Sequence, residues 1–180
     1  MATKAKKSAS KSRPVKKTAS TVKRKSARTA SRPVASGRPK HLPQGYGTVT
    51  PFLSARGAAE LLDFLIRALG AEKVMSMPGP GDTIVHAEVD IGGSRLMISE
   101  TMQGEPTPGA FYLYVPDADV LHQRAIDAGA TLVRPMSDEF WGDRVGMVRD
   151  SFGNVWSIAT HIEDVTPEEV ARRAAAAMNR

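Results

Sequence analysis

The sequence predicts an α+β fold in which two strand-helix-three-strand modules form a cupped mixed sheet, preceded by a disordered basic tail. An internal repeat is the first observation: the stretches Leu69-Gly70-Ala71 and Ala128-Gly129-Ala130 each follow an expected helix. Second, apolar residues recur at helical spacing before each junction and alternate with polar residues after it. Third, residues 1–40 carry 14 Lys and Arg and no acidic residue, whereas residues 41–180 carry 11 basic and 19 acidic residues.

The first module is expected to begin with a strand over 48–54. The helix Ala58–Leu69 follows, because its leucines are spaced along one helical face, and Gly70 ends it. Three strands complete the module, separated by the turn Pro78-Gly79-Pro80-Gly81-Asp82 and the pair Gly92-Gly93: 72–77, 83–91 and 94–99. In the strand 83–91 alternation predicts one apolar face, which we expect to pack under the helix: Val85, Ala87, Val89 and Ile91.

The second module repeats this order. Its helix is expected over 118–128, and its strands over 110–115, 131–135, 144–149 and 154–160. Bulky apolar side chains such as Trp156 and Ile158 should pack under the helices, leaving smaller and polar ones to line the cup. A capping box at Thr166–Glu169, with Pro167 at the first helical position, predicts a further helix to about Met178.

These patterns divide the chain into a tail over 1–40, a linker over 41–47, a globular domain over 48–162 and a capped C-terminal helix over 163–180. The tail has too few apolar residues to fold alone. Its charge predicts sequence-independent binding to nucleic acid phosphates, carried by Lys6, Lys7, Lys16, Lys17, Lys23, Arg24, Lys25 and Arg28. A solubilising extension without a partner and an organelle transit peptide are the alternatives.

Several classes are excluded by what the sequence lacks. The absence of cysteine excludes a disulfide scaffold, a thiolate metal site and a cysteine nucleophile. No apolar run reaches the ~20 residues of a membrane span, and no phosphate-binding glycine motif opens a helix. We therefore expect a cytoplasmic protein with no membrane partner, for which association with the nucleoid is open.

Two stretches of the domain resemble a known family. The segment LLDFLIRALGAE and the run FWGDRVGMVRDSFGNVWSIATH, together with the repeated module order, resemble the vicinal oxygen chelate superfamily of glyoxalases, bleomycin-resistance proteins and extradiol dioxygenases. The second run is similar to the PhnB-like branch, and the tail is similar to basic histone-like tails. The resemblance covers about residues 47–169 and implies a glyoxalase-like fold, a homodimer and a small hydrophobic or aromatic ligand.

The resemblance also implies a divalent metal held by one His or Glu on each of four strands. In this sequence those four positions fall at Thr50, Met97, Ala110 and Ser157. Hydroxyl, thioether and methyl groups are poor ligands for Ni, Zn, Mn or Fe(II). No metal ligand and no cofactor are therefore predicted, although a divalent metal is not excluded.

Other side chains remain candidates for chemistry. His86 and Glu88 share one strand face, as a catalytic acid–base pair, two metal ligands or a surface pair. His161 is expected to make a structural hydrogen bond. The substrate-binding candidates are Tyr112, Tyr114, Trp141, Arg144, Thr50 and Ser157. For the tyrosines the alternative is a place at the core edge. For Arg144 the alternative is a turn at Asp143–Arg144, and for Trp141 it is a side chain that caps the core.

Three functions follow. The first is a small-molecule binding protein without the usual metal ligands, tethered to nucleic acid by its tail. The second is a metal-independent or atypical-metal enzyme of the same fold, a lyase, isomerase or dioxygenase type, using His86, Glu88 and Arg144. The third is a nucleoid-associated DNA-binding protein in which the cup serves as a dimerisation platform. Loss of turnover on substituting His86 or Glu88, or loss of DNA binding on deleting the tail, would separate them.

Overall fold

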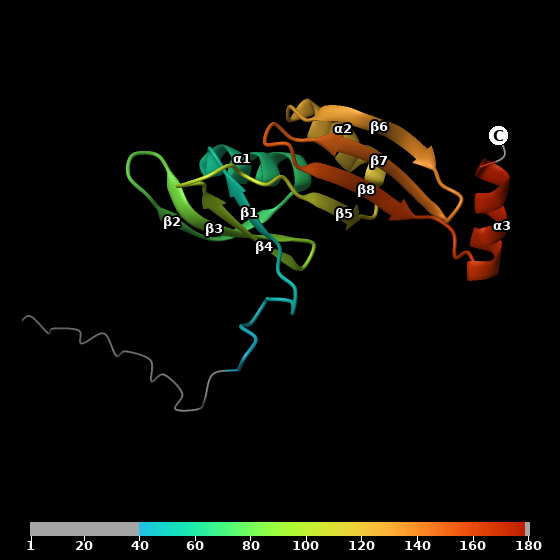
Figure 1. Ribbon diagram of the computed structural model, residues 1–180, viewed down its shortest axis with the longest axis horizontal. Coiled ribbons are helices and arrows are strands. Elements are labelled where there is room, and N and C mark those ends of the chain that lie inside the picture. Colours follow the sequence, from blue (N-terminus) through green and yellow to red (C-terminus); the bar gives the residue numbers. More distant parts are fainter. Residues whose placement is uncertain (1–39, 179–180) are drawn as a thin grey trace, which may run out of the picture. The chain divides into compact units, whose positions relative to one another are not determined.

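The computed structural model describes residues 40–178, so the predicted nucleic-acid-binding residues of the tail lie outside the described part. The elements follow one another in the predicted order (Figure 1). The first module comprises β1 (Phe52–Ala55), α1 (Ala58–Leu69), β2 (Glu72–Pro78), β3 (Ile84–Ile91) and β4 (Ser94–Glu100). The second comprises β5 (Ala110–Tyr114), α2 (Ala118–Asp127), β6 (Thr131–Asp138), β7 (Asp143–Arg149) and β8 (Val155–His161), and α3 (Pro167–Met178) follows.

The strands form two four-stranded mixed sheets with the same topology. The first sheet has the order β1-β4-β3-β2 and the second the order β5-β8-β7-β6. In each sheet the first strand runs parallel to its neighbour and the other pairs are antiparallel. This confirms the predicted fold class and the internal repeat. It also leaves β1 and β5 as edge strands of their sheets.

Helix α1 forms where the leucine spacing predicts it, with both bounds as expected. Leu61 and Leu65 are fully buried, and α1 packs on β3 and β4. Gly57 and Gly70 flank the helix with φ of 89° and 71°, which side chains other than glycine rarely adopt. The Glu100 carboxylate accepts hydrogen bonds from the backbone N–H groups of Gly57 and Ala58, so it satisfies donors that a helix start leaves free.

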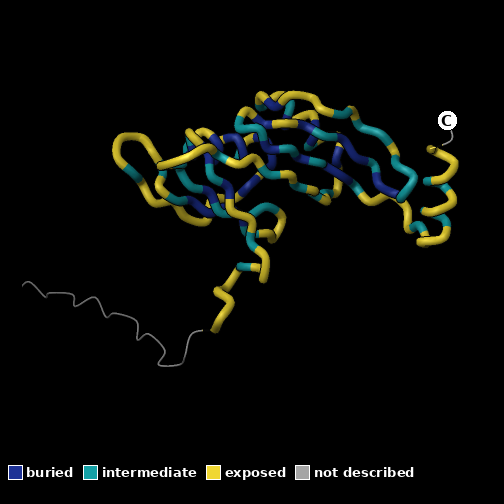
Figure 2. The backbone as a smooth tube through the Cα atoms, viewed as in Figure 1, coloured by how far each residue is buried: buried dark blue, intermediate teal, exposed yellow. Residues whose placement is uncertain are grey.

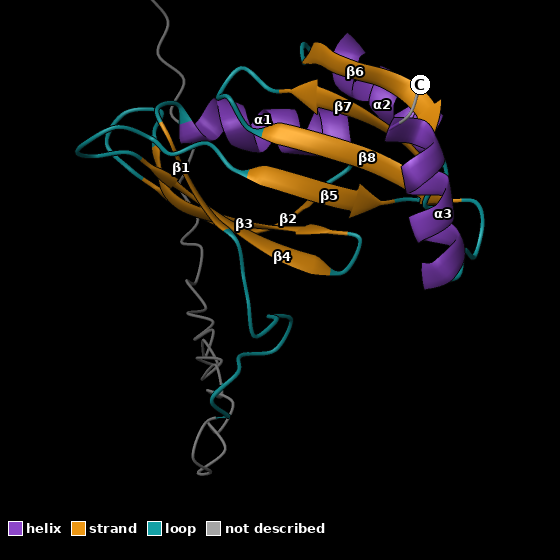
Figure 3. Ribbon diagram, turned by 45° about the vertical axis from the view of Figure 1, so that its right-hand side comes forward, coloured by secondary structure: helices purple, strands orange, loops and turns teal. Residues whose placement is uncertain are grey.

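Helix α2 joins the two modules. Its N-cap is Asp117, whose side chain accepts from the Val120 N–H at 3.0 Å. The Arg124 guanidinium, from the last turn of α2, donates to the carbonyls of Ile66 and Arg67 at the end of α1. A cation suits the carbonyl end of a helix, so this residue fixes α2 against α1. Figure 3 shows both helices alongside the sheets.

The sequence run that resembles the family contains a turn between β7 and β8 that is anchored by a buried carboxylate. Asp150 is buried and accepts from the backbone N–H groups of Phe152 and Asn154 and from Trp156 Nε1 at 3.0 Å. Trp156 is itself fully buried and stacks on Phe111 of the neighbouring strand. The RDSFGNVW part of the motif therefore secures the core of the second module.

Several strand ends differ from the expected bounds by one residue, and β6 runs to Asp138 rather than to residue 135. Two further expectations differ from the structure. The β1 ladder begins at Phe52 rather than at residue 48, because the Thr50 hydroxyl donates to the Gly47 carbonyl in a turn before it. Val85 was expected under the helix but is 44% exposed, since it lies near the open end of β3; Ala87 and Val89 on the same face are fully buried. Strand β2 is exposed along its whole length, as Figure 2 shows.

Helix α3 confirms the predicted cap. The Thr166 hydroxyl accepts from the Glu169 N–H at 3.3 Å, and Pro167 is the first helical residue. Arg173 then pairs with both Glu163 and Glu169. None of the helical residues is buried, so ion pairs rather than apolar packing attach α3 to the preceding segment.

Candidate functional site

A buried carboxylate, that of Asp143, lies at the start of β7 and collects four side-chain donors. The side chain is on the face of the second sheet opposite α2, and the residue is 2% exposed. Its Oδ2 accepts from the Tyr112 hydroxyl at 3.0 Å, the Tyr114 hydroxyl at 2.9 Å and Trp141 Nε1 at 3.0 Å. Its Oδ1 lies 2.9 Å from His161 Nδ1. We call these five residues the Asp143 cluster.

The Asp143 cluster keeps its carboxylate ionised. Burial alone would raise the pKa of Asp143, but the hydrogen bonds from His161, both tyrosines and Trp141 outweigh burial and hold that pKa below its usual range. The same contacts act on the donors: burial, and then the bond to Asp143, raise the pKa of Tyr112 to about 12. The pKa of His161 is raised by the carboxylates of Asp143 and Asp164.

The strand alternation of β5 explains why both tyrosines reach Asp143. Tyr112 and Tyr114 point to one face, with ring centroids 5.1 Å apart, and they remain 47% and 64% exposed. Ser157 pairs with Tyr112 across the β5–β8 ladder and shares that face. The structure thus brings together three of the predicted binding residues, Tyr112, Tyr114 and Trp141, with Ser157 beside them.

A second polar cluster lies on the first sheet, on the face opposite α1. Glu88 is 7% exposed, and its carboxylate lies 3.0 Å from Arg95 Nη1 and 3.4 Å from His86 Nε2. The Tyr46 ring, from the segment before β1, covers the Arg95 guanidinium at 5.1 Å. We call these four residues the Glu88 cluster.

The contacts of the Glu88 cluster weaken Glu88 as the base of the predicted acid–base pair. Hydrogen bonding by the Tyr46 hydroxyl, and then by His86 and Arg95, lowers the pKa of Glu88 despite its burial. A carboxylate with a lowered pKa that is paired with a guanidinium is a weak proton acceptor at neutral pH. His86 and Glu88 do share one face, as predicted, and their catalytic role stays a prediction.

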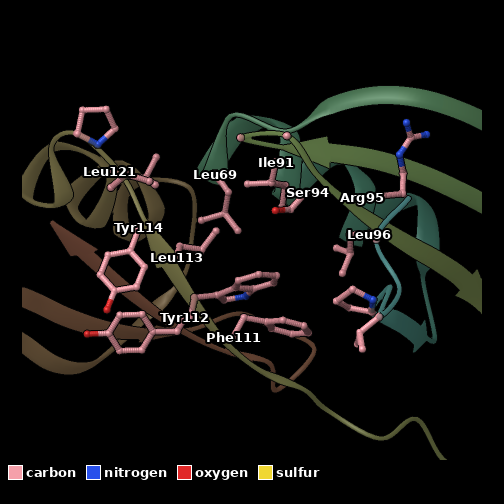
Figure 4. Close-up of a pocket in the computed structure, with 18 of the residues that line it drawn as sticks. Leu69, Ile91, Ser94, Arg95, Leu96, Phe111, Tyr112, Leu113, Tyr114 and Leu121 are labelled. Carbon is pink, nitrogen blue, oxygen red and sulfur yellow. The ribbon is translucent and has the colours of Figure 1, made fainter. Parts of the chain in front are cut away.

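A cavity of about 1080 Å³ lies beside β5, between the two modules. Apolar side chains from α1, the β3–β4 turn, β5 and α2 form most of its wall, and the buried Trp156 also contributes. Figure 4 shows the Tyr112 and Tyr114 rings at one end and Arg95 at the other, so the cavity reaches both polar clusters. The labelled apolar residues are Leu69, Ile91, Leu96, Phe111, Leu113 and Leu121.

Arg144 lies apart from the Asp143 cluster, because consecutive strand residues point to opposite faces. Its guanidinium makes two short bonds to Asp119 of α2, at 2.6 and 2.7 Å, and one to Asp138 of β6 at 2.9 Å. The two carboxylates raise the pKa of Arg144. Held by two carboxylates on the helix side, Arg144 links α2 to β6, and its predicted role in ligand binding stays a prediction.

At the four positions where the resemblance places metal ligands, the side chains are hydroxyl, thioether and methyl groups, which suit a divalent ion poorly. Met97 lies in mid-strand opposite Phe52 and Glu88, and Ala110 opens β5. Thr50 bonds to Gly47, and Ser157 is the remaining hydroxyl. Within residues 40–178, no three His, Cys, Asp or Glu side chains gather closely enough to hold one ion.

Sequence reasoning named the aromatic members of the site but not the acid that organises them. A turn at Asp143–Arg144 was one of two open interpretations, and no local pattern places the Asp143 carboxylate beside the tyrosines, because β7 and β5 are joined only through β8. The structural hydrogen bond expected of His161 is confirmed. Arg95 and Tyr46 were missed because a strand ladder and the folding back of residues 40–47 bring them to Glu88, and neither has a local signal.

Comparison with known proteins finds relatives that are similar in sequence and in fold. An uncharacterized protein of Mycobacterium tuberculosis is 34% identical over 134 residues, which are 68% of this chain and 79% of that protein. The crystal structure of TioX from Micromonospora sp. ML1 is 30% identical, with a TM-score of 0.57, and the match covers 63% of this chain and 97% of TioX. The structure of protein PA1353 from Pseudomonas aeruginosa, 23% identical over 64% of this chain and 98% of that one, has a TM-score of 0.52 and shows the shared fold.

None of the helices among residues 40–178 is both long and apolar enough to cross a membrane.

Residues 48–158 match the profile of the Glyoxalase/Bleomycin resistance protein/Dioxygenase superfamily, which spans both modules. The match agrees with the paired topology of the two sheets. The chain belongs to the Glyoxalase/Bleomycin resistance protein/Dioxygenase superfamily.

Proposed function

We propose that this protein binds a small hydrophobic or aromatic molecule in the cavity beside β5 and acts by holding it, without the divalent metal used by many relatives. The observation that carries the proposal is the cavity itself, about 1080 Å³ with a largely apolar wall. Ligand sites are typically clefts of about this size, with few polar groups. The Tyr112 and Tyr114 hydroxyls are held by Asp143, so their rings are fixed before a ligand arrives.

The residues at the metal positions favour binding over metal-dependent turnover. Thr50, Met97, Ala110 and Ser157 offer no imidazole or carboxylate, so they do not suit a divalent ion. The arginine and glutamate of the Glu88 cluster are paired with each other, which makes Glu88 a weak base.

A fluorescent apolar probe tests this proposal. N-phenyl-1-naphthylamine should gain fluorescence with the full chain and be recovered unchanged. Leu113→Gln, in the cavity wall, should weaken binding about tenfold, because it places an amide against the apolar ligand surface. Val133→Gln, at an exposed position of the distant edge strand β6, is the matched control and should bind as the unsubstituted chain does. Equal binding by both variants would contradict the proposed site.

We propose further that the chain forms a homodimer. Support comes from the unpaired edges of β1 and β5 and from large exposed apolar side chains beside them, Val49 and Phe52. Sedimentation equilibrium should give twice the chain mass. Phe52→Lys should shift the equilibrium toward the monomer, and a monomer at all concentrations would contradict the dimer.

The composition of residues 1–40 alone supports the proposal that this segment tethers the protein to nucleic acid. Fourteen basic residues and no acidic ones should bind duplex DNA by counterion release, with affinity that falls steeply as salt rises. Deleting Met1–Lys40 should abolish this binding. DNA affinity that is unchanged at low salt would contradict the tether.

A further inference from the structure

We propose that the ligand bound beside β5 is an organic cation, and that the Tyr112 and Tyr114 rings of the Asp143 cluster recognise its charge. This inference rests on the proposed function and adds the chemical class of the ligand. Three aromatic donors converge on a single carboxylate oxygen, from Tyr112 at 3.0 Å, Tyr114 at 2.9 Å and Trp141 at 3.0 Å. Aromatic faces attract ammonium groups, and more so where water is excluded.

The placement of the negative charge is the first argument. The Tyr112 and Tyr114 rings line the cavity, while their hydroxyls bond to the buried Asp143 carboxylate (Figure 4). A phenol that donates to a carboxylate has a more electron-rich ring. The carboxylate therefore strengthens the attraction of the rings for a cation, although its own acceptor sites are already filled.

The remaining charges around the cavity are balanced. Arg95 at the far end is paired with Glu88, and Asp117 and Arg124 in the wall have opposite signs. Asp143 therefore decides the sign of the local field. Residues 41–180 carry 19 acidic against 11 basic residues, which favours the approach of a cation to this part of the chain.

His161 provides an internal control on the charge. Its Nδ1 lies 2.9 Å from Asp143 of β7 and its Nε2 lies 3.1 Å from Asp164. The two β5 tyrosines donate to the same Asp143 carboxylate. The protonated imidazole neutralises the carboxylate and the neutral imidazole does not. Cation affinity should therefore rise as the pH rises through the pKa of His161, which lies above its ordinary value because of Asp143 and Asp164.

Two probes of similar shape separate charge from apolar contact. Phenyltrimethylammonium and the uncharged N,N-dimethylaniline are titrated into the full chain by calorimetry at several pH values. The cation should bind about tenfold more tightly than the neutral probe above the pKa of His161, and the ratio should shrink below it. Asp143→Asn should lower the ratio several-fold, to the smaller preference that the neutral tyrosine rings supply alone. Tyr114→Phe keeps the ring but removes one bond to Asp143, so it should lower the ratio by a smaller factor.

The outcomes distinguish this inference from the proposed function. Equal affinity for both probes at every pH overturns the cation proposal and leaves the apolar binding site intact. The same holds if N-phenyl-1-naphthylamine binds and phenyltrimethylammonium does not. If none of the three probes binds, both proposals fall. Should Asp143→Asn fail to fold, the pH dependence of the unsubstituted chain and the Tyr114→Phe ratio still decide the matter.

Discussion

Each module of this chain buries a carboxylate on an equivalent strand, Glu88 on β3 and Asp143 on β7, and the two are balanced in different ways. Glu88 meets a full positive charge, the Arg95 guanidinium at 3.0 Å. Asp143 meets three neutral donors and one imidazole that titrates. The internal repeat therefore preserves the packing of the module and not the chemistry on its open face.

That difference assigns different roles to the two faces. In an ion pair between a carboxylate and a guanidinium, each charge neutralises the other, so little net charge is left to attract a ligand. A carboxylate held by neutral donors keeps its charge, and the field reaches whatever lies against the donors. Under the proposed function, the second module recognises the ligand, while the Glu88 cluster holds Tyr46 and the segment before β1.

Breaking the ion pair of the first module should have the largest effect. Glu88→Gln leaves the buried Arg95 guanidinium without its charge partner, and should lower the free energy of unfolding by about 3 kcal/mol. Urea denaturation of the full chain measures this loss. The double variant Glu88→Gln with Arg95→Met removes both charges and should recover most of the stability. A double variant as unstable as the sum of the single ones would show that the pair is not coupled.

Neutralising the carboxylate of the second module should cost less. Asp143→Asn keeps one acceptor oxygen but replaces the other with an NH2 group, which cannot accept from the tyrosine and tryptophan donors. The free energy of unfolding should fall by about 2 kcal/mol. The same denaturation experiment compares it with Glu88→Gln. A loss smaller than that of Tyr112→Phe would contradict the role of Asp143 as the centre of its cluster.

The His161 and Glu88 contributions to stability should depend on pH in opposite directions. The raised pKa of His161 means that its pairing with Asp143 stabilises fully below the ordinary value of 6.5, and that this stabilisation is lost as the pH rises through the folded-state pKa. The lowered pKa of Glu88 means that its contribution is present above the ordinary value of 4.5 and is lost as the pH falls through the folded-state pKa.

Imidazole proton resonances followed against pH should report a raised pKa for His161, and Asp143→Asn should lower it. The unfolding free energy of His161→Gln should lose the alkaline dependence and keep the acid one. A pKa of His161 that Asp143→Asn leaves unchanged would disprove the coupling.

The contact that joins the modules should have the smallest effect. Arg124→Ala removes the donor to the last carbonyls of α1, and should cost about 1 kcal/mol. Arg124→Lys keeps the charge at the helix end and should recover part of this loss. Thermal unfolding of the three chains checks the order, and an alanine variant as stable as the lysine one would contradict the link between α1 and α2.

Local patterns predicted most of the fold. Helix α1 was predicted at both bounds because leucine spacing and Gly70 are both local signals. The start of β1 was not, because its ladder depends on pairing Phe52 with Met97, 45 residues later in the sequence. The exposure of Val85 likewise depends on how far α1 extends over β3, which no pattern within β3 specifies.

The site was predictable only in part, for the same physical reason. Alternation within β5 placed Tyr112 and Tyr114 on one face, and the nearby Trp141 was also named. Their common partner Asp143 was not, because a carboxylate next to a turn glycine looks like a surface residue until strands far apart in the sequence are paired. Arg144 looked free for the complementary reason, since Asp119 and Asp138 reach it from other elements.

The most direct test of the central claim is the map of backbone amide shifts when N-phenyl-1-naphthylamine is added to the ¹⁵N-labelled chain. The account predicts that the shifts concentrate on β5, on the β3–β4 turn and on the first turns of α2, which surround the cavity. Shifts confined to β2 and β3 around His86 and Glu88 would contradict it, and would favour instead the acid–base site on the first sheet.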